Sequence, residues 1–439
     1  MTSSFKIAIA GLGTVGGGVV KALALRGEDL SRRAGRRLEI VGVSARDKNK
    51  ARGFAVKGWT DDPLSLAKGD ADMVVELIGG EEGIARQLVE TALANKKHVV
   101  TANKALLAKH GLQLAQLAEK NGVTLKFEAA AAGGIPIVKA LREGLIAHGV
   151  DAVKGILNGT CNYILTEMES SGRSFADVLK EAQAKGYAEA DPTLDVGGGD
   201  TAHKLALLAS LAFGTVPNLD AVAVEGIEHI TPDDIAFASE FGYRIKLLGV
   251  ARRIGNKIDQ KVHPAMVKVR AALANVPGAA NGVLVDAGEA GSFFFSGRGA
   301  GEAPTASAVI ADIVEAASGV LSPVFGRPAS DLSRLAPADG KQAVSSWYLR
   351  FEVLDVPGVL ASIAGHLAEA GVSIESMIQR VRAPGAPVAI VMITHETAQA
   401  AVERALKAIA ASDKVRARPC MIRRPERSPQ CATAKSRHR

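Results

Sequence analysis

The first 130 residues alternate short apolar runs, rich in β-branched residues, with segments whose apolar positions recur at helical spacing. Helical periodicity is clearest in Ile84–Asn95 and Ala105–Asn121. The runs predicted to be strands are Lys6–Ala10, Glu39–Val43, Met73–Ile78, His98–Thr101 and Thr124–Glu128. Alternation of strands and helices in this way predicts an α/β domain whose parallel sheet is covered by helices on both faces.

The pattern changes after about residue 133 and again after about residue 345. Residues 133–302 mix helical and strand-like segments with many glycines, which predicts an α+β domain. The glycine-rich turn Gly297–Pro304 leads to an apolar helix at Thr305–Gly319, which we expect to pack back on the first domain. Residues 323–345 are rich in Pro, Ala and Ser and are predicted to be a linker.

Residues 346–422 carry a third pattern, which we interpret as a separate ferredoxin-like module with the order βαββαβ. Two helices are expected, at Val359–Ala370 and Ala398–Ala411. The four strands of its antiparallel sheet are expected at Trp347–Val353, Val372–Arg380, Pro387–Thr394 and Val415–Ile422.

The net charge of +7 comes from the C-terminal end of the 439-residue chain. Residues 413–439 hold nine basic and two acidic residues, a balance of +7, so residues 1–412 are formally neutral. A basic tail is not a basic groove, which argues against a nucleic-acid partner, and residues 423–439 are expected to be disordered. Neither a membrane-spanning run nor a disulfide framework is indicated, because the apolar runs are short and Cys numbers 3. We therefore expect a cytoplasmic protein without membrane association.

A glycine motif follows the first predicted strand and opens a helix. Its first glycine permits a sharp turn, its second lets the backbone approach a pyrophosphate, and its third lets helix and strand pack closely. Its position inside a strand–helix alternation makes the motif specific, and it predicts a Rossmann-type dinucleotide-binding domain. The motif residues are Gly11, Leu12, Gly13, Thr14, Val15 and Gly16.

The end of the second predicted strand bears on the choice of cofactor. NAD-binding sites usually place an acid there to hold the ribose hydroxyls. Val43 is followed instead by Ser44 and Ala45, and then by Arg46, Asp47 and Lys48. Arg46 and Lys48 could pair with a 2′-phosphate, which favours NADP(H) over NAD(H), whereas Asp47 keeps NAD(H) open.

Acidic residues and glycines are concentrated in 181–204, a segment that ends in Lys204 just before the apolar helix predicted at Leu205–Phe213. Asp200 lies four residues before Lys204, so a helix starting near Asp200 places both side chains on one face. A dehydrogenase needs a group that transfers a proton as hydride moves, and a lysine with a lowered pKa can serve. Lys104 follows another strand end and is a candidate second cation. A surface ion pair and an ordinary helix-start lysine are the alternative interpretations.

Residues 182–204 resemble the signature of the homoserine dehydrogenases. The resemblance extends in the family's order over about residues 5–325, through GLGTVG (11–16), TANKALLA (101–108), EAAAAGGIPIV (128–138), GILNGTCNYIL (155–165) and GRGAGEAPTASAV (297–309). It implies reduction of L-aspartate 4-semialdehyde to L-homoserine with NAD(P)H, on the route to threonine, methionine and isoleucine. A homodimer or homotetramer is implied as well.

The resemblance also implies roles for individual residues. Lys204 corresponds to the proton-transfer residue, and Asp200 to the carboxylate that binds substrate and positions that lysine. Lys104 lies near both cofactor and substrate, and Glu189 holds the amino group of the substrate. Two glycines, Gly186 and Gly301, correspond to positions beside the nicotinamide nucleotide. A structural monovalent cation, commonly Na⁺, is implied at Glu128 and at the backbone carbonyls of Ala131, Gly133 and Ile135.

The C-terminal module resembles an ACT domain through DVPGVLASIAGHLAEAGVSI (355–374). ACT domains bind small amino acids, so the resemblance implies feedback inhibition by L-threonine, with Asp355 and Gly358 as effector-binding residues. Turn chemistry at the start of a helix is the alternative interpretation of both residues.

Two other functions stay open. Aspartate-semialdehyde dehydrogenase chemistry needs a cysteine nucleophile, and Cys161 is the candidate because Cys420 and Cys431 lie in the module and the tail. A non-catalytic amino-acid sensor would bind an effector without oxidising NADPH. The expected organisation is a dinucleotide-binding domain (1–132 plus 303–322), a substrate-binding and dimerisation domain (133–302), the linker (323–345), an ACT-like regulatory domain (346–422) and the tail (423–439).

Overall fold

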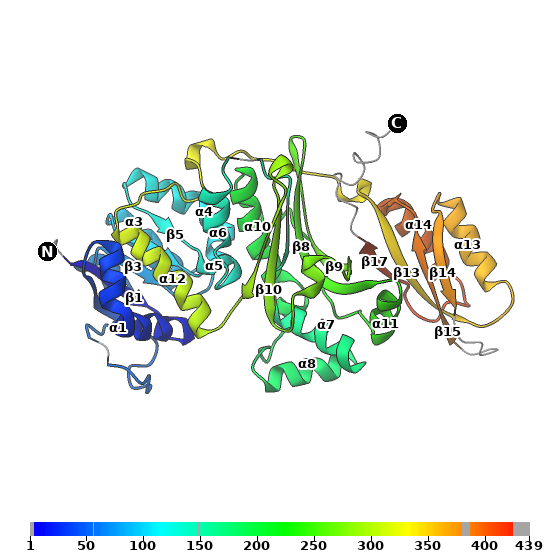
Figure 1. The fold of residues 1–439 in the computed structure, drawn as a ribbon, viewed down its shortest axis with the longest axis horizontal. Helices are drawn as coiled ribbons and strands as arrows, with labels where there is room; N and C mark the ends of the chain where they lie inside the picture. The colour runs from blue at the N-terminus through cyan, green and yellow to red at the C-terminus, as the bar shows by residue number, and fades with distance from the viewer. Residues whose placement is uncertain (1–3, 56, 148, 380–386, 425–439) are drawn as a thin grey trace.

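The computed structural model describes residues 4–55, 57–147, 149–379 and 387–424 and arranges them as three units in a row (Figure 1). The first unit contains a five-stranded sheet with the order β2-β1-β3-β4-β5, in which every pair of neighbouring strands is parallel. The predicted Rossmann-type sheet is thereby confirmed. Its strands are β1 (Phe5–Ala10), β2 (Leu38–Ser44), β3 (Met73–Glu76), β4 (His98–Thr101) and β5 (Leu125–Lys126).

Helices cover both faces of this sheet and bury its strands on both sides. One face packs against α1 (Thr14–Ala34) and α12 (Glu302–Ala317). The other packs against α2 (Pro63–Lys68), α3 (Ile84–Ala94) and α4 (Lys104–Lys120). The helix α12 thus returns to the first domain from a distant part of the chain.

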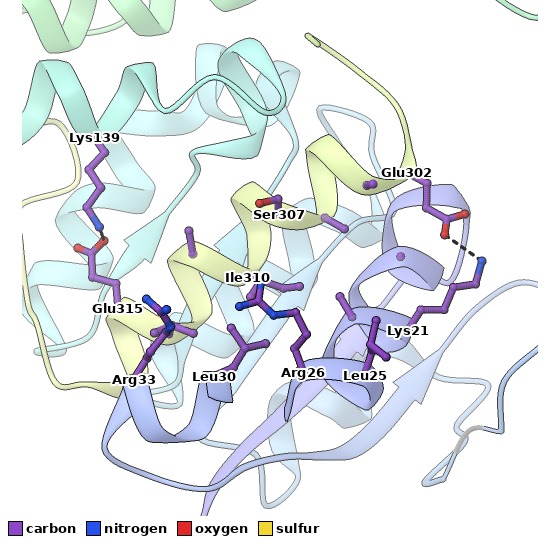
Figure 2. Close-up of a pocket in the computed structure, with 16 residues that line it drawn as sticks. Lys21, Leu25, Arg26, Leu30, Arg33, Lys139, Glu302, Ser307, Ile310 and Glu315 are labelled. Atoms are coloured by element: carbon purple, nitrogen blue, oxygen red, sulfur yellow. Dashed lines mark hydrogen bonds and ion pairs between the residues drawn. The ribbon is translucent and has the colours of Figure 1, made fainter. Parts of the chain in front are cut away.

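The helices α1 and α12 lie side by side (Figures 1 and 2). A Cβ atom at Gly18 would come within 2.7 Å of Glu302 Cγ, so glycine permits this close packing. Lys21 and Glu302 form an ion pair across the two helices at 2.9 Å. A groove of about 810 Å³ runs between them and is lined by apolar side chains, such as Leu30 and Ile310, and by basic ones.

The second unit is built on the strands β11-β10-β6-β8-β9, which are antiparallel to one another. These strands are β6 (Ala152–Ile156), β8 (Tyr243–Ile254), β9 (Lys257–Lys268), β10 (Ala280–Asp286) and β11 (Ser292–Arg298). The helix α10 (Gly199–Phe213) packs against β8 and β9 and also against α4 of the first unit. The helices are α5 (Ala129–Ala132), α6 (Ile137–Lys139), α7 (Gly159–Ser171), α8 (Phe175–Ala184), α9 (Thr193–Val196), α10 (Gly199–Phe213) and α11 (Pro232–Glu240).

The third unit has the predicted ferredoxin-like order, with its strands arranged as β17-β13-β15-β14. Its elements are β13 (Val344–Leu354), α13 (Val359–Glu369), β14 (Ile374–Gln379), β15 (Pro387–Thr394), α14 (Gln399–Ala410) and β17 (Cys420–Arg424). The predicted last strand, Val415–Ile422, begins too early and ends too early. Val415 forms an isolated bridge to Val353, and regular pairing with β13 starts at Cys420, after Pro419, which has no N–H to donate.

The third unit is joined to the second by a shared sheet and by a buried ion pair. The strand β17 pairs with β13 and also with β9, where Arg423 lies opposite Ala265, so the two sheets are continuous. Asp234 in α11 is fully buried and accepts hydrogen bonds from Arg350 Nε at 2.6 Å and from the Tyr348 hydroxyl at 2.9 Å. The module that the sequence pattern predicts to be separate is therefore docked on the central unit.

The linker segment lies along the central unit. Within it, β12 (Ala336–Pro337) pairs with β9, and Ser333 forms a bridge to Thr215. Two short strands complete the sheets, β7 (Ala223–Val224) beside β9 and β16 (Thr397–Ala398) beside β13. Arg423 and Arg424 of the predicted tail belong to β17, and residues 425–439 lie outside the described part of the chain. A helix long and apolar enough to span a bilayer is absent from the described residues.

Candidate active site

The glycine motif forms the turn between β1 and α1. Gly11 has φ of +101°, and a Cβ there would lie 2.4 Å from the Leu77 carbonyl oxygen. At Gly16 a Cβ would lie 1.9 Å from the Gly11 carbonyl oxygen, so only glycine fits. Gly13 differs, because a Cβ there would meet nothing within 4 Å, and it precedes α1 without any side-chain cap. The open backbone and uncapped N–H groups of this helix end fit the pyrophosphate of a dinucleotide.

The loop after β2 carries the residues predicted to select the cofactor. Arg46 and Lys48 are exposed. The Asp47 carboxylate accepts a hydrogen bond from the Asn49 backbone N–H at 2.8 Å, so it stabilises its own turn. The two cations therefore remain available to a ligand, while the nearby acid is engaged locally.

The helix α4 begins shortly after the end of β4, and Asn103 caps its N-terminus. The Asn103 side-chain oxygen accepts from the Leu106 N–H at 3.1 Å, and its amide nitrogen donates to the Gly80 carbonyl at 2.6 Å. Glu76, at the end of β3, accepts from the Thr101 hydroxyl at 2.6 Å and from the backbone N–H of Ile78 at 2.8 Å. These contacts fix the position of Lys104, the first residue of α4.

Lys104, Asp200 and Lys204 form one cluster. Asp200 lies in the first turn of α10, and its carboxylate contacts Lys204 Nζ at 2.7 Å and Lys104 Nζ at 3.0 Å. The spacing of four residues places Asp200 and Lys204 on one face of α10, as the sequence predicts. The side chain of Asp200 is 8% exposed, whereas that of Lys104 is 32% exposed. The structure thus brings together one buried carboxylate and two cations.

The charge of this carboxylate is maintained by its neighbours. Burial alone would raise the pKa of Asp200, but the charges of Lys204 and Lys104 and the hydrogen bonds to Lys204 and Asn158 bring that pKa well below its ordinary value. Asp200 is therefore ionised at neutral pH. Because it is anionic and largely buried, it can hold and orient Lys204 while remaining charged itself.

Two residues next to this cluster, Asn158 and Asp195, were not among the predicted site residues. Asn158 caps α7, and its amide donates to Asp200 at 2.9 Å and to Asp195 at 2.8 Å. Burial and the charge of Asp200 raise the pKa of Asp195, although Asn158 opposes this. The sequence signal available for Asn158 is a helix-capping asparagine after a strand, at Leu157-Asn158-Gly159. That signal predicts a cap and does not reveal its contact with Asp200, 42 residues away.

Three further predicted residues lie outside this network of contacts. Glu189 is exposed, and its carboxylate has no hydrogen-bond partner among the residues that the structure describes. Gly186 follows α8 with φ of +74°, and a Cβ there would meet nothing within 4 Å. Gly301 precedes α12 with φ of +115°, which favours glycine. These positions are open to a ligand, and the structure does not by itself assign them one.

The predicted cation site is a turn rich in oxygen atoms. Glu128 is 4% exposed, and its carboxylate accepts hydrogen bonds from the backbone N–H groups of Val138 at 2.9 Å and Lys139 at 2.8 Å. The Ile135 carbonyl accepts from the Ile137 N–H, but the carbonyl oxygens of Ala131 and Gly133 have no donor within the described ranges. Free carbonyls next to a carboxylate fit a hard monovalent cation. A cluster of three or more His, Cys, Asp or Glu side chains able to hold a metal is not found among the described residues.

Cys161 is buried and lacks the surroundings of a nucleophile. Its Sγ donates to the Asp195 carbonyl at 3.2 Å, and burial, together with the charges of Asp195 and Asp200, raises the pKa of the thiol well above its ordinary value. A reactive cysteine needs an accessible thiolate with a lowered pKa. This geometry argues against the cysteine-dependent alternative.

Replacing Cys161 with serine is expected to keep turnover within about threefold of the wild type, because a hydroxyl can donate to the same carbonyl. Steady-state NADPH oxidation measures the effect, and Cys420→Ser, at another buried thiol, is the matched control. Complete loss of turnover in Cys161→Ser alone would instead support a cysteine nucleophile.

The groove between α1 and α12 is distinct from this site. None of the residues that line it belongs to the cluster of Lys104, Asp200 and Lys204 (Figure 2).

In the third unit, Gly358 precedes α13 with φ of +88°, which favours glycine in this turn. Asp355 lies in the same turn, between β13 and α13. Both predicted effector residues therefore occupy one loop.

Comparison with known proteins agrees with this architecture. Residues 11–128 match the homoserine dehydrogenase NAD-binding domain, residues 136–314 the homoserine dehydrogenase catalytic family, and residues 347–413 the ACT domain. The homoserine dehydrogenase of Neisseria gonorrhoeae is 46% identical over 427 residues, covering 95% of this chain and 98% of that protein. That of Pseudomonas aeruginosa is 43% identical, covering 93% and 96%.

A solved structure leads to the same conclusion. The crystal structure of a homoserine dehydrogenase from Thiobacillus denitrificans superimposes with a TM-score of 0.91 at 43% identity and covers 97% of this chain and 99% of that one. The parallel sheet with its glycine turn, the central unit and the ACT domain all fall within this match. The chain therefore belongs to the homoserine dehydrogenase family, as an oxidoreductase with a nicotinamide-dinucleotide-binding domain and a C-terminal ACT domain.

Proposed function

We propose that this protein reduces L-aspartate 4-semialdehyde to L-homoserine with NADPH, in the synthesis of threonine, methionine and isoleucine. The observation that carries the proposal is the buried Asp200 carboxylate held between Lys204 and Lys104. Lys204 is the candidate proton donor, and hydrogen bonds to Asp200 and to the Leu157 carbonyl hold its ammonium group in position. The test is semialdehyde-dependent oxidation of NADPH and NADH by the full chain. Absence of oxidation with either nucleotide would refute the proposal.

Lys204 acts in this mechanism as a general acid. When bound, the dinucleotide supplies hydride to the aldehyde carbon. Two of the three ammonium protons of Lys204 are directed to Asp200 and to the Leu157 carbonyl, each at 2.7 Å. The third is free to polarise the aldehyde oxygen and to be transferred to it. Lys104 lies on the other side of Asp200, where its charge supports the oxyanion as it forms.

The substrate is an amino acid, and acidic side chains suit its ammonium group. We assign Glu189 to this role, and we assign Asp200 as a second carboxylate that binds the substrate. Glu189 is exposed, so an incoming ligand can reach its carboxylate. The rival sensor function would use the same groups for binding alone, and it would show no NADPH oxidation.

We infer a preference for NADP(H), carried by Arg46 and Lys48. Replacing Arg46 with alanine is expected to raise KM for NADPH about tenfold, because one charge-assisted hydrogen bond to the 2′-phosphate is lost. KM for NADH should remain close to that of the wild type. Initial rates with both nucleotides measure the effect, and Lys50→Ala, in the same exposed loop, is the control. Equal effects on both nucleotides would contradict the assignment.

We also propose that Glu128, with the carbonyls of Ala131, Gly133 and Ile135, holds a monovalent cation, of which Na⁺ is the expected species. Such an ion would supply structural charge for the turn between α5 and α6, beside the Gly299 backbone. A Cβ at Gly133 would lie 2.1 Å from the Gly299 carbonyl oxygen, so this turn and the 297–301 loop are in close contact. The ion takes no part in the proton transfer.

We propose L-threonine as the effector of the ACT domain, at the turn that carries Asp355 and Gly358, in a cytoplasmic homodimer or homotetramer. Asp355→Ala is expected to weaken threonine binding about tenfold or more, because a carboxylate–ammonium contact is lost, while uninhibited turnover is kept. Calorimetric titration of the full-length protein, together with inhibition curves, measures this. Threonine inhibition that is equal in wild type and variant would place the effector elsewhere.

A further inference from the structure

The carbonyl oxygen of Leu157 is shared by two donors. Lys204 Nζ donates to it at 2.7 Å, and the amide nitrogen of Asn281 donates to it at 3.1 Å. A carbonyl oxygen has two lone pairs, so both bonds can form at once. Through this hydrogen bond, Lys204 is held at the end of β6 in the central sheet.

Asn281 reaches this carbonyl because of the register between two strands. It lies in β10, where its neighbour Gly282 is opposite Ile156, the last residue of β6. That register places Asn281 next to Leu157, which directly follows β6. Asn281 is 1% exposed, and its side-chain oxygen has no hydrogen-bond partner within the described part of the chain.

The same amide also packs against the loop that leads to α12. A Cβ at Gly299 would lie 2.1 Å from the carboxamide of Asn281, so the glycine permits direct contact between this backbone and the amide. Gly301 of this loop is one of the positions assigned to the cofactor. Asn281 thus lies between the carbonyl that holds Lys204 and the loop on the cofactor side.

We propose that Asn281 is a positioning residue for the reaction, acting on Lys204 through the Leu157 carbonyl. The proposal rests on the proposed function, because it assumes that Lys204 transfers the proton. By donating to this oxygen, Asn281 fixes its direction and draws on its electron density. The carbonyl then orients the Lys204 ammonium without holding its proton strongly.

Losing this donor has a defined consequence for Lys204. The Leu157 oxygen becomes a stronger acceptor, so it holds the protonated ammonium of Lys204 more strongly, and proton release to the substrate becomes harder. The other groups that face Lys204 are Asp200 on its own helix, Asp195 in α9 and Cys161 in α7, with Lys104 of α4 reaching the same carboxylate. A neutral substitution at Asn281 leaves these groups in place, so a displaced pH profile reports on the shared carbonyl.

The test uses Asn281→Ala and Asn281→Val, whose side chains are neutral and lack the N–H donor. In both, the alkaline limb of kcat/KM for semialdehyde reduction is expected to move to higher pH by about half a unit to one unit, the equivalent of one hydrogen bond. At neutral pH, kcat should fall about threefold to tenfold, and KM for NADPH should stay at its wild-type value. The alanine variant cannot clash with the Gly299 backbone, so it keeps the test valid if valine disturbs the packing there.

The matched control is Asn162→Leu. Asn162 is also buried. Its amide donates to the carbonyls of Val276, Gly278 and Ala280 at the start of β10, and its oxygen accepts from Lys246, but it does not contact Leu157. It should lower the melting temperature and leave the alkaline limb in place. An unmoved limb in folded, active Asn281 variants, or the same shift in Asn162→Leu, would overturn the positioning role. An inactive wild-type protein would instead refute the proposed function.

Discussion

Replacing Lys204 with alanine is expected to reduce kcat for semialdehyde reduction by a factor of about 10² to 10⁴, the usual contribution of a positioned general acid. NADPH binding should persist, since the glycine turn between β1 and α1 contains no part of α10. Asp200 would retain Lys104 as a cation at 3.0 Å, which limits the structural damage. Stopped-flow or steady-state NADPH oxidation, with nucleotide binding followed by fluorescence, measures both quantities.

Lys204→Arg separates charge from proton transfer. Arginine keeps the ion pair with Asp200 but does not release a proton in proteins. We therefore expect this variant to be nearly as slow as the alanine variant while remaining as stable as the wild type. Recovery of most of the turnover by arginine would show that position 204 acts through its charge alone, and normal turnover by Lys204→Ala would remove the mechanism.

The second large effect is expected at the junction between the ACT domain and the central unit. Arg350→Met should lower the free energy of unfolding by about 3–5 kcal/mol, because it leaves a buried carboxylate without its cation. That carboxylate belongs to Asp234, which is 0% exposed and is contacted by Arg350 through both of its oxygens. Thermal melts and urea unfolding of the full chain measure the change.

The pH dependence of this effect has a definite sign. Burial acts to raise the pKa of Asp234, but Arg350 and Thr231 lower it overall below its ordinary value. A carboxyl whose pKa is lower in the folded state stabilises the protein above its unfolded pKa, and the contribution disappears as pH falls through the folded pKa. The difference between wild type and Arg350→Met should therefore shrink on acidification. Arg26→Met, which removes an exposed ion pair with Asp29, is the control and should leave the melting temperature nearly unchanged; equal losses in both variants would contradict the account.

Local patterns were sufficient to predict the Rossmann-type sheet and the ferredoxin-like module. Buried β-branched runs, helical periodicity and the glycine turn each report on contacts within a few residues. The pair Asp200 and Lys204 belongs to this class, because four residues of helix define their geometry. Lys104 was accessible to reasoning as well, since the carboxyl ends of parallel strands meet at one edge of the sheet.

Contacts between distant segments were not predictable in this way. Asn158 reaches Asp195 and Asp200 from another element, and its sequence signal is that of a helix cap. The pairing of β17 with β9 joins the ACT domain to the central sheet. It depends on the register that places Arg423 opposite Ala265, and this register leaves no local pattern. The start of the last strand was misplaced because valine is a residue type that favours strands, whereas regular pairing begins only after Pro419.

The most direct test of the central claim follows the hydride and the proton donor together. The wild-type protein and Lys204→Ala are incubated with L-aspartate 4-semialdehyde and NADPH that carries deuterium at both C4 positions of the nicotinamide, and the product is analysed by mass spectrometry. The account predicts deuterated L-homoserine, formed in equal amount with NADP⁺ by the wild type, and almost none formed by the variant. Unlabelled product, an acyl phosphate formed only with NADP⁺ and phosphate, or equal yields from both proteins would contradict it.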